Sequence, residues 1–156
     1  MPINNELIIK TNEKLGIFLN SFSKLQLPVT AEHGDYSPIN ILIDQSGKIF
    51  VLDWEFYQEN AEPLFDFVFF LLSTCTKKKP YSLRENFYGS GKYAHIIRVL
   101  ISEFTQAKGL PVDIVVQAVP YVIVRRLYRA SRGTDNKQLD ITEYLKMLED
   151  WDKACL

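Results

Sequence analysis

Cysteine and histidine are scarce in this 156-residue chain, and each scarcity excludes a class of protein. The two cysteines, Cys75 and Cys155, are far apart and fit no CxxC or CxxH spacing. They suit a reducing cytosol better than a disulfide framework. The two histidines, His33 and His95, offer no spacing for a zinc site. We therefore expect a cytoplasmic protein with neither a disulfide scaffold nor structural zinc.

An excess of one charge and long apolar runs are also missing. The formal net charge is -1, so nothing global points to nucleic acid or to an acidic membrane. The longest uncharged runs, 67–76 and 114–124, are well short of the roughly 18 to 20 residues that a membrane span needs. The first ten residues lack the basic start and apolar core of a signal peptide. We expect no nucleic-acid partner and no membrane span.

What remains is ordinary globular composition, with 47% hydrophobic and 24% charged residues. The length suits one domain with a real core. Apolar residues recur at three- and four-residue spacing in several stretches, and Pro120 should kink the fourth of them. The predicted helices cover residues 4–24, 64–74, 93–107, 112–131 and 140–153. The segments 77–80 and 81–88 are predicted as loops.

Two short strands are predicted between the first two helices. Apolar residues alternate over 39–43 and over 48–52, and Asp44-Gln45-Ser46-Gly47 between them is a turn sequence. A hairpin that pairs these strands brings Asn40, at its entry, close to Asp53, at its exit. We expect the hairpin to pack between the helices.

Polar residues around this hairpin form a pattern, His33-x-Asp35-x-x-x-x-Asn40 followed by Asp53 and Asp66. Phosphoryl transfer needs a carboxylate that accepts the proton of the attacking hydroxyl, and Asp35 is suited to that role. It also needs hard oxygen ligands for magnesium. The side-chain oxygens of Asn40 and Asp53 are such ligands.

The spacing of His33, Asp35 and Asn40 is that of the kinase catalytic loop, and Asp53 occupies the place of the metal-binding aspartate that follows. Glycine stands at position 34 where protein kinases have arginine, and Trp54 follows Asp53. HGD-x-x-x-x-N, a hairpin and then Asp-Trp resemble the aminoglycoside phosphotransferase and choline kinase-like family. The resemblance covers residues 33–66.

The resemblance implies an activity, a magnesium-dependent transfer of the γ-phosphoryl group of ATP to a small-molecule hydroxyl acceptor. Asp35 would be the catalytic base, and Asn40 and Asp53 would bind the magnesium ion. His33 would brace the catalytic loop, and Asp66 would accept hydrogen bonds from its backbone. An aspartate in the apolar setting of Asp66 needs such partners, because burying it without them is costly.

The resemblance also implies a fold, the carboxyl-terminal lobe of a protein kinase-like enzyme. This is an α+β, mostly helical domain spanning residues 1–156, with a catalytic core at 29–70 and a helical, acceptor-side region at 71–156. Gly16 is the only glycine among the 32 residues before His33, so those residues hold no glycine-rich phosphate loop. Three explanations stay open: the chain is the carboxyl-terminal portion of a longer enzyme, another chain supplies the amino-terminal lobe in trans, or the chain is a remnant without activity. A homo-oligomer is also expected.

Each motif residue also has a plain structural interpretation. Asp35 would make an Asx-turn, Asn40 would lie in a turn entering a strand, and Asp53 would end a strand. His33 would be a packed core histidine. At the level of function, the alternative is a non-catalytic kinase-like module, or half of a split enzyme, that binds a partner.

A row of arginines recurs at three- and four-residue spacing near the end of the fourth predicted helix. Such a row is more often a solvated face, with cations favoured near a helix carboxyl terminus, and that is our expectation. The alternative is contact with an anionic acceptor or a partner. The row consists of Arg125, Arg126, Arg129 and Arg132.

Overall fold

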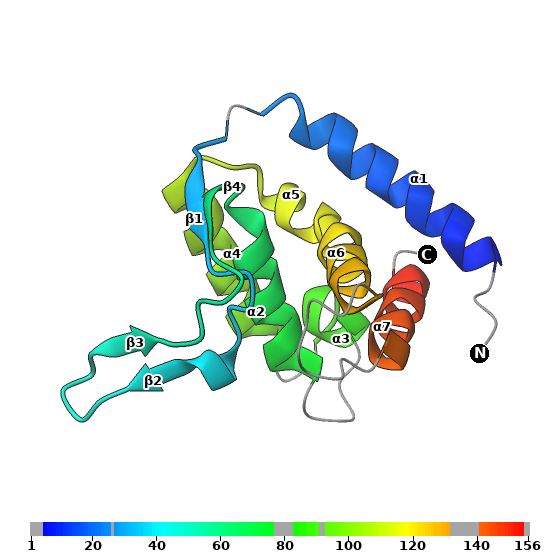
Figure 1. The fold of residues 1–156 in the computed structure, drawn as a ribbon. Coiled ribbons are helices and arrows are strands. Elements are labelled where there is room, and N and C mark those ends of the chain that lie inside the picture. The colour runs from blue at the N-terminus through cyan, green and yellow to red at the C-terminus, as the bar shows by residue number, and fades with distance from the viewer. Residues whose placement is uncertain (1–4, 26, 77–82, 91–92, 132–140, 155–156) are drawn as a thin grey trace.

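The computed structural model describes residues 5–25, 27–76, 83–90, 93–131 and 141–154. The chain is an α+β protein, mostly helical, with two small antiparallel sheets (Figure 1). The helices are α1 (Asn5–Phe22), α2 (Leu64–Thr76), α3 (Leu83–Phe87), α4 (Ala94–Lys108), α5 (Val112–Gln117), α6 (Val119–Ser131) and α7 (Ile141–Ala154). The strands are β1 (Thr30–Glu32), β2 (Ile41–Ile43), β3 (Ile49–Val51) and β4 (Gln58–Ala61), and a 3₁₀ turn, η1, covers Pro38–Asn40.

Helix α2 is the centre of the core. It is apolar almost all round, as its sequence LFDFVFFLLSTCT predicts, and most of its described apolar side chains are buried. The other six helices contribute buried side chains to the same cluster, for example Phe18 from α1, Ile97 from α4 and Trp151 from α7. Apolar packing therefore holds helix α2 on most of its sides, including at its amino-terminal residues Leu64 and Phe65.

The two sheets are nested. Strand β1 pairs with β4, and within the segment that they enclose β2 pairs with β3. The inner pair has the predicted hairpin register, with Ile41 opposite Val51 and Ile43 opposite Ile49. The predicted hairpin is confirmed, with shorter strands, because Pro38 starts the 3₁₀ turn that takes in Asn40.

The hairpin does not pack between the helices, and that expectation is wrong. It projects from the helical body as an arm (Figure 1). Side chains on both of its faces are exposed, including Leu42 and Phe50 on one face and Ile43 and Ile49 on the other.

Most predicted helices are confirmed within a few residues, and α4 ends at Gly109, which has φ 66°. The stretch 112–131 is two helices rather than one kinked helix. The break falls at Ala118, which leaves Pro120 in the first turn of α6, where a missing N–H costs nothing. Part of the predicted loop 81–88 is helix α3. Strand β4 was not predicted, because Gln58–Ala61 has no β-type alternation of its own.

Several expectations lie outside the described residues. They are the loop 77–80, the start of the last predicted helix at residue 140, the side chains of Cys75 and Cys155, and Arg132. Within the described ranges, no single helix has the length and apolarity to cross a membrane. Helix α4 and residues 112–130 meet that test only as a pair, bent by 113°, and by length and composition alone.

The central position of α2 predicts a large effect of truncating its side chains. Leu71→Ala removes a fully buried side chain and leaves a cavity, so the free energy of unfolding should fall by about 2–5 kcal/mol. The matched control Leu19→Ala changes an exposed leucine of α1 and should stay within about 0.5 kcal/mol. Urea unfolding measures both, and equal losses would contradict the central role of α2.

Candidate functional site

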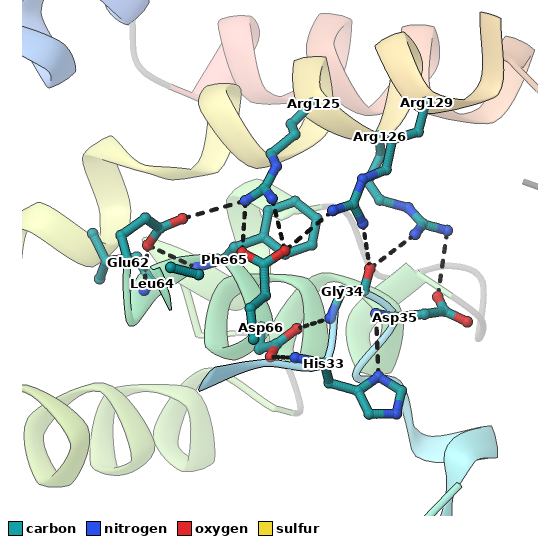
Figure 2. A network of polar contacts seen from close by, with 12 residues as sticks. His33, Gly34, Asp35, Glu62, Leu64, Phe65, Asp66, Arg125, Arg126 and Arg129 are labelled. Carbon is teal, nitrogen blue, oxygen red and sulfur yellow. Dashed lines mark hydrogen bonds and ion pairs between the residues drawn. The ribbon is translucent and has the colours of Figure 1, made fainter. Parts of the chain in front are cut away.

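The loop between β1 and η1, residues 33–37, is the candidate catalytic loop. It is buried although it is irregular, and His33, Asp35 and Ser37 each expose less than a tenth of their surface. Buried backbone groups need hydrogen-bond partners. Helix α2 approaches the loop from one side and helix α6 from the other (Figure 2).

Asp66, in the first turn of α2, holds the backbone of the loop. Its Oδ2 accepts a hydrogen bond from the amide of His33 at 2.5 Å, and its Oδ1 accepts one from the amide of Gly34 at 2.9 Å. Burial raises the pKa of the Asp66 carboxyl, while these two amides offset part of the shift. The helix amino terminus also favours an acidic side chain at this position.

The imidazole of His33 ties the loop to the end of the hairpin. Its Nδ1 accepts a hydrogen bond from the amide of Asp35 at 3.2 Å, and its Nε2 lies 2.7 Å from the carbonyl oxygen of Leu52. Since an amide only donates and a carbonyl only accepts, the ring is the neutral tautomer with its proton on Nε2. The ring of Trp54 lies 4.7 Å away, centroid to centroid. His33 therefore links Asp35 to the residue before Asp53.

Asp35 and Asn40 are in direct contact. The Nδ2 of Asn40 donates to the backbone oxygen of Asp35 at 2.9 Å and to its carboxylate Oδ2 at 3.0 Å. This fixes the carboxylate relative to the loop. It also commits the amide nitrogen of Asn40, which leaves Oδ1 as the atom able to bind a cation.

Asp53 lies at the exit of the hairpin, one residue after Leu52, whose amide donates to the carbonyl of Asn40 at 2.9 Å. Asp53 is exposed and has φ 64°, a left-handed conformation that is uncommon outside glycine and often marks functional positions. The hairpin thus brings the backbone next to Asp53 onto Asn40, as the sequence predicts.

Within the described residues, no group of three His, Cys, Asp or Glu side chains is placed to hold a metal ion. The ligand pair proposed from the motif is Asn40 and Asp53. Because Asn40 is an amide, this pair is not a group of His, Cys, Asp or Glu side chains. A hard cation such as magnesium, which keeps several waters, needs only one or two protein carboxylates. The oxygen donors present therefore fit magnesium in kind.

Gly34 is the one loop residue that admits no side chain. Its φ is 82°, and a Cβ there would lie 2.6 Å from the Cβ of Phe56 and 2.7 Å from its carbonyl oxygen. The carbonyl of Gly34 accepts hydrogen bonds from Arg129 at 2.7 Å and from Arg126 at 3.3 Å. Guanidinium groups from α6 therefore hold the backbone of the loop at Gly34.

The arginines of α6 are not a solvated face, and that expectation is wrong for Arg125, Arg126 and Arg129. All three turn inward onto the loop (Figure 2), and Arg126 is 3% exposed. Its Nη2 lies 3.4 Å from Oδ1 of Asp35, and its Nε donates to the hydroxyl of Tyr144 at 3.3 Å. Arg126 therefore connects the candidate base to helix α7.

Glu32, which was not predicted as a site residue, is the anion at the centre of this cluster. Its side chain is 1% exposed. Arg125 donates to both of its oxygens, at 2.7 and 2.8 Å, and Arg129 donates to one at 3.1 Å. The two guanidinium groups also lie over the ring of Phe65, at 4.1 and 4.9 Å from its centroid. The sequence does contain a signal for this cluster: an acid stands directly before His33, and a row of arginines follows downstream.

An open cleft of about 310 Å³ lies beside the candidate loop. His33, Tyr36 and Asp66 border it on the loop side, together with Trp54. Helix α4 adds Phe104, which stacks on Phe67 of α2 with ring centroids 3.9 Å apart. Helices α2 and α4 both border this cleft.

Comparison with models of known protein families, with curated proteins and with solved structures gave no match. The chemical roles of Asp35, Asn40 and Asp53 accordingly rest on the motif and on the contacts described above.

The buried Glu32 should be essential to stability. Glu32→Gln keeps the shape but leaves Arg125 and Arg129 facing a neutral group, and breaking such a buried pair costs about 3–5 kcal/mol of unfolding free energy. Glu59→Gln, on the exposed side of β4, is the matched control and should stay within about 0.5 kcal/mol. Similar losses in the two variants would show that the cluster is not a stabilising unit.

Glu62 should give stability a distinctive pH dependence. Its Oε2 accepts hydrogen bonds from the amides of Leu64 and Phe65, yet burial, aided by the charge of Glu32, raises the pKa of its carboxyl above 4.5. The folded chain then keeps a proton that the unfolded chain releases, so this contribution to stability falls as pH rises above 4.5 and levels off above the raised pKa.

Glu62→Gln removes that contribution. The difference between the unfolding free energies of the wild type and the variant should therefore shift against the wild type as pH rises through this window. Urea unfolding at a series of pH values measures the difference. A flat profile, or one that rises with pH, would contradict the assignment.

Proposed function

We propose that this chain is the catalytic lobe of a small-molecule kinase. The observation that supports the proposal best is the contact set around Asp35, in which Asp66 holds the loop backbone, His33 braces it and Asn40 orients the carboxylate. These contacts join residues whose order and spacing are those of the kinase catalytic loop.

In this proposal Asp35 orients the acceptor hydroxyl and accepts its proton as the oxygen attacks the γ-phosphorus of ATP. The protein takes little part in covalent chemistry, so most of the rate acceleration comes from positioning the acceptor hydroxyl and the phosphates. Asn40 and Arg126 hold the two carboxylate oxygens of Asp35 from different sides. The side chain is thereby fixed while 11% of it stays accessible.

Asn40, through Oδ1, and Asp53, through its carboxylate, would hold the magnesium ion. When bound, that ion neutralises charge on the β- and γ-phosphates. The exposed position of Asp53 at the hairpin exit suits a residue that meets a nucleotide. Its left-handed backbone, which costs energy in an aspartate, is consistent with a position retained for function.

The proposal extends to the family. The nested sheets, the HGD-x-x-x-x-N loop and the hairpin ending in Asp-Trp support a carboxyl-terminal lobe like that of aminoglycoside phosphotransferases and choline kinases. The proposal also requires a lobe that covers the nucleotide, in the same protein or on another chain. In this proposal the acceptor is a small molecule with a hydroxyl group, and the cleft beside Tyr36 borders the loop.

A second candidate is a non-catalytic module, or half of a split enzyme, that uses the same loop only as a scaffold. The projecting hairpin favours it, because large apolar side chains on both faces of the arm are exposed. In that case the buried contacts of Asp35 would serve stability alone, and no magnesium-dependent nucleotide binding would accompany them.

The two candidates differ in nucleotide binding. Calorimetric titration of the full chain with ATP should show binding that requires magnesium. Asp53→Ala should weaken that binding by at least about tenfold, because it removes a metal ligand. Asp35→Asn should keep the binding and, in a transfer assay with the acceptor and the covering lobe, abolish transfer.

Glu103→Ala, at an exposed position of α4, is the control and should bind as the wild type does. If Asp53→Ala leaves the magnesium-dependent binding of ATP unchanged, Asp53 is not a magnesium ligand. Absence of magnesium-dependent binding in the wild type would favour the non-catalytic candidate.

A further inference from the structure

The cleft beside the candidate loop is lined mainly by rings. Of the ten described residues that line it, five carry an aromatic side chain. Three of these come from the loop and from the exit of the hairpin, where the ring of His33 packs against Tyr36 and Trp54 with centroids 6.0 and 4.7 Å away. The other two are Phe67 of α2 and Phe104 of α4, whose rings stack on each other.

The size of the cleft suits a small molecule. Its volume of about 310 Å³ lies at the lower end of the roughly 300–1,000 Å³ that is typical of ligand sites. The rings that line it are not fully covered by the protein, since Trp54 is 50% exposed and Phe67 and Phe104 are only partly buried. Covering this apolar surface with a ligand would therefore be favourable.

Only two of the described residues that line the cleft carry a charge, because His33 is the neutral tautomer. One is Asp66, whose two carboxylate oxygens already accept hydrogen bonds from the loop backbone (Figure 2). The other is Lys108, the last residue of α4, which is exposed. Its ammonium group forms no ion pair with any other described residue. The charge that the cleft offers to a ligand is thus a single positive one.

We propose that this cleft binds a small molecule in which an aromatic ring carries one carboxylate group. The ring of the ligand would pack against the aromatic side chains of the cleft, which favour offset-stacked and edge-to-face partners. The carboxylate would pair with Lys108. One lysine balances one negative charge, whereas a phosphate monoester carries nearly two at neutral pH.

Lys108 is the residue that sets the sign of the ligand's charge. Ring faces also attract cations, so the aromatic side chains alone would accept an amine as well as an acid. The ammonium group of Lys108 attracts an acid and repels an amine. Because an exposed ion pair is weak, each such preference should be about two- to fivefold in affinity.

This inference goes beyond the proposed function, because binding in the cleft requires neither nucleotide nor magnesium. Asp35 and Asp53 are not among the residues that line the cleft. To identify the bound acid with the acceptor of the kinase would rest on the proposed function, whereas its binding does not. A failure of either proposal therefore leaves the other standing.

Three probes that share one ring and one chain length test the charge preference. They are 3-phenylpropionate, 3-phenylpropionamide and 3-phenylpropylamine, titrated into the full chain without nucleotide or magnesium and followed by saturation-transfer NMR. The acid should bind about two- to fivefold more tightly than the amide, and the amide more tightly than the amine.

Lys108→Met removes the charge at an exposed position. In this variant the acid and the amide should bind equally well, and the amine should bind more tightly than it does to the wild type. Lys24→Met, at an exposed position after α1 and outside the cleft, is the matched control and should keep the order of the wild type.

Phe104→Leu tests the aromatic lining. Leucine keeps apolar packing but removes the ring, so all three probes should bind about threefold or more weakly without a change in their order. Phe50→Leu, on the arm, is the matched control and should bind as the wild type does. Absence of binding by all three probes would overturn the proposal, as would an acid preference that survives Lys108→Met or a wild type that binds the amine best.

Discussion

Two hydrogen bonds from the loop backbone to the Asp66 carboxylate are the contact on which the candidate site depends. They join the start of the loop to the amino terminus of α2, whose described apolar side chains are mostly buried. The loop has no regular structure of its own, so its conformation is imposed by this anchor. The hydrogen bonds of His33 and Asn40 then connect the anchored loop to Asp35 and to the end of the hairpin.

The opposite side of the loop is held by charge. Helix α6 brings guanidinium groups to the carbonyl of Gly34, to Asp35 and to the buried Glu32. Three arginines in a low-dielectric setting would be costly without acids between them, and Glu32 and Asp35 supply these. The same arrangement explains the glycine at position 34, since any side chain there would occupy the space of Phe56 and meet Arg129.

The sequence predicted those elements whose pattern lies within a short stretch of residues. The hairpin followed from alternation and a turn sequence, and most helices followed from their periodicity. The contacts among His33, Asp35, Asn40 and Asp66 fit an order and spacing that can be read directly. Strand β4 and the inward face of α6 could not be predicted, because β4 owes its structure to pairing with β1 and the arginines owe their burial to an acid far away in the chain.

One contact has a consequence for how the molecule forms. Glu32 and Arg125 are 93 positions apart, so the acid beside the loop has no cation until almost the entire chain is available. Contacts of such long separation form slowly, because a large loop must close first. The contacts that α6 makes with Glu32, Gly34 and Asp35 can therefore form only once residues 125–129 have been synthesised.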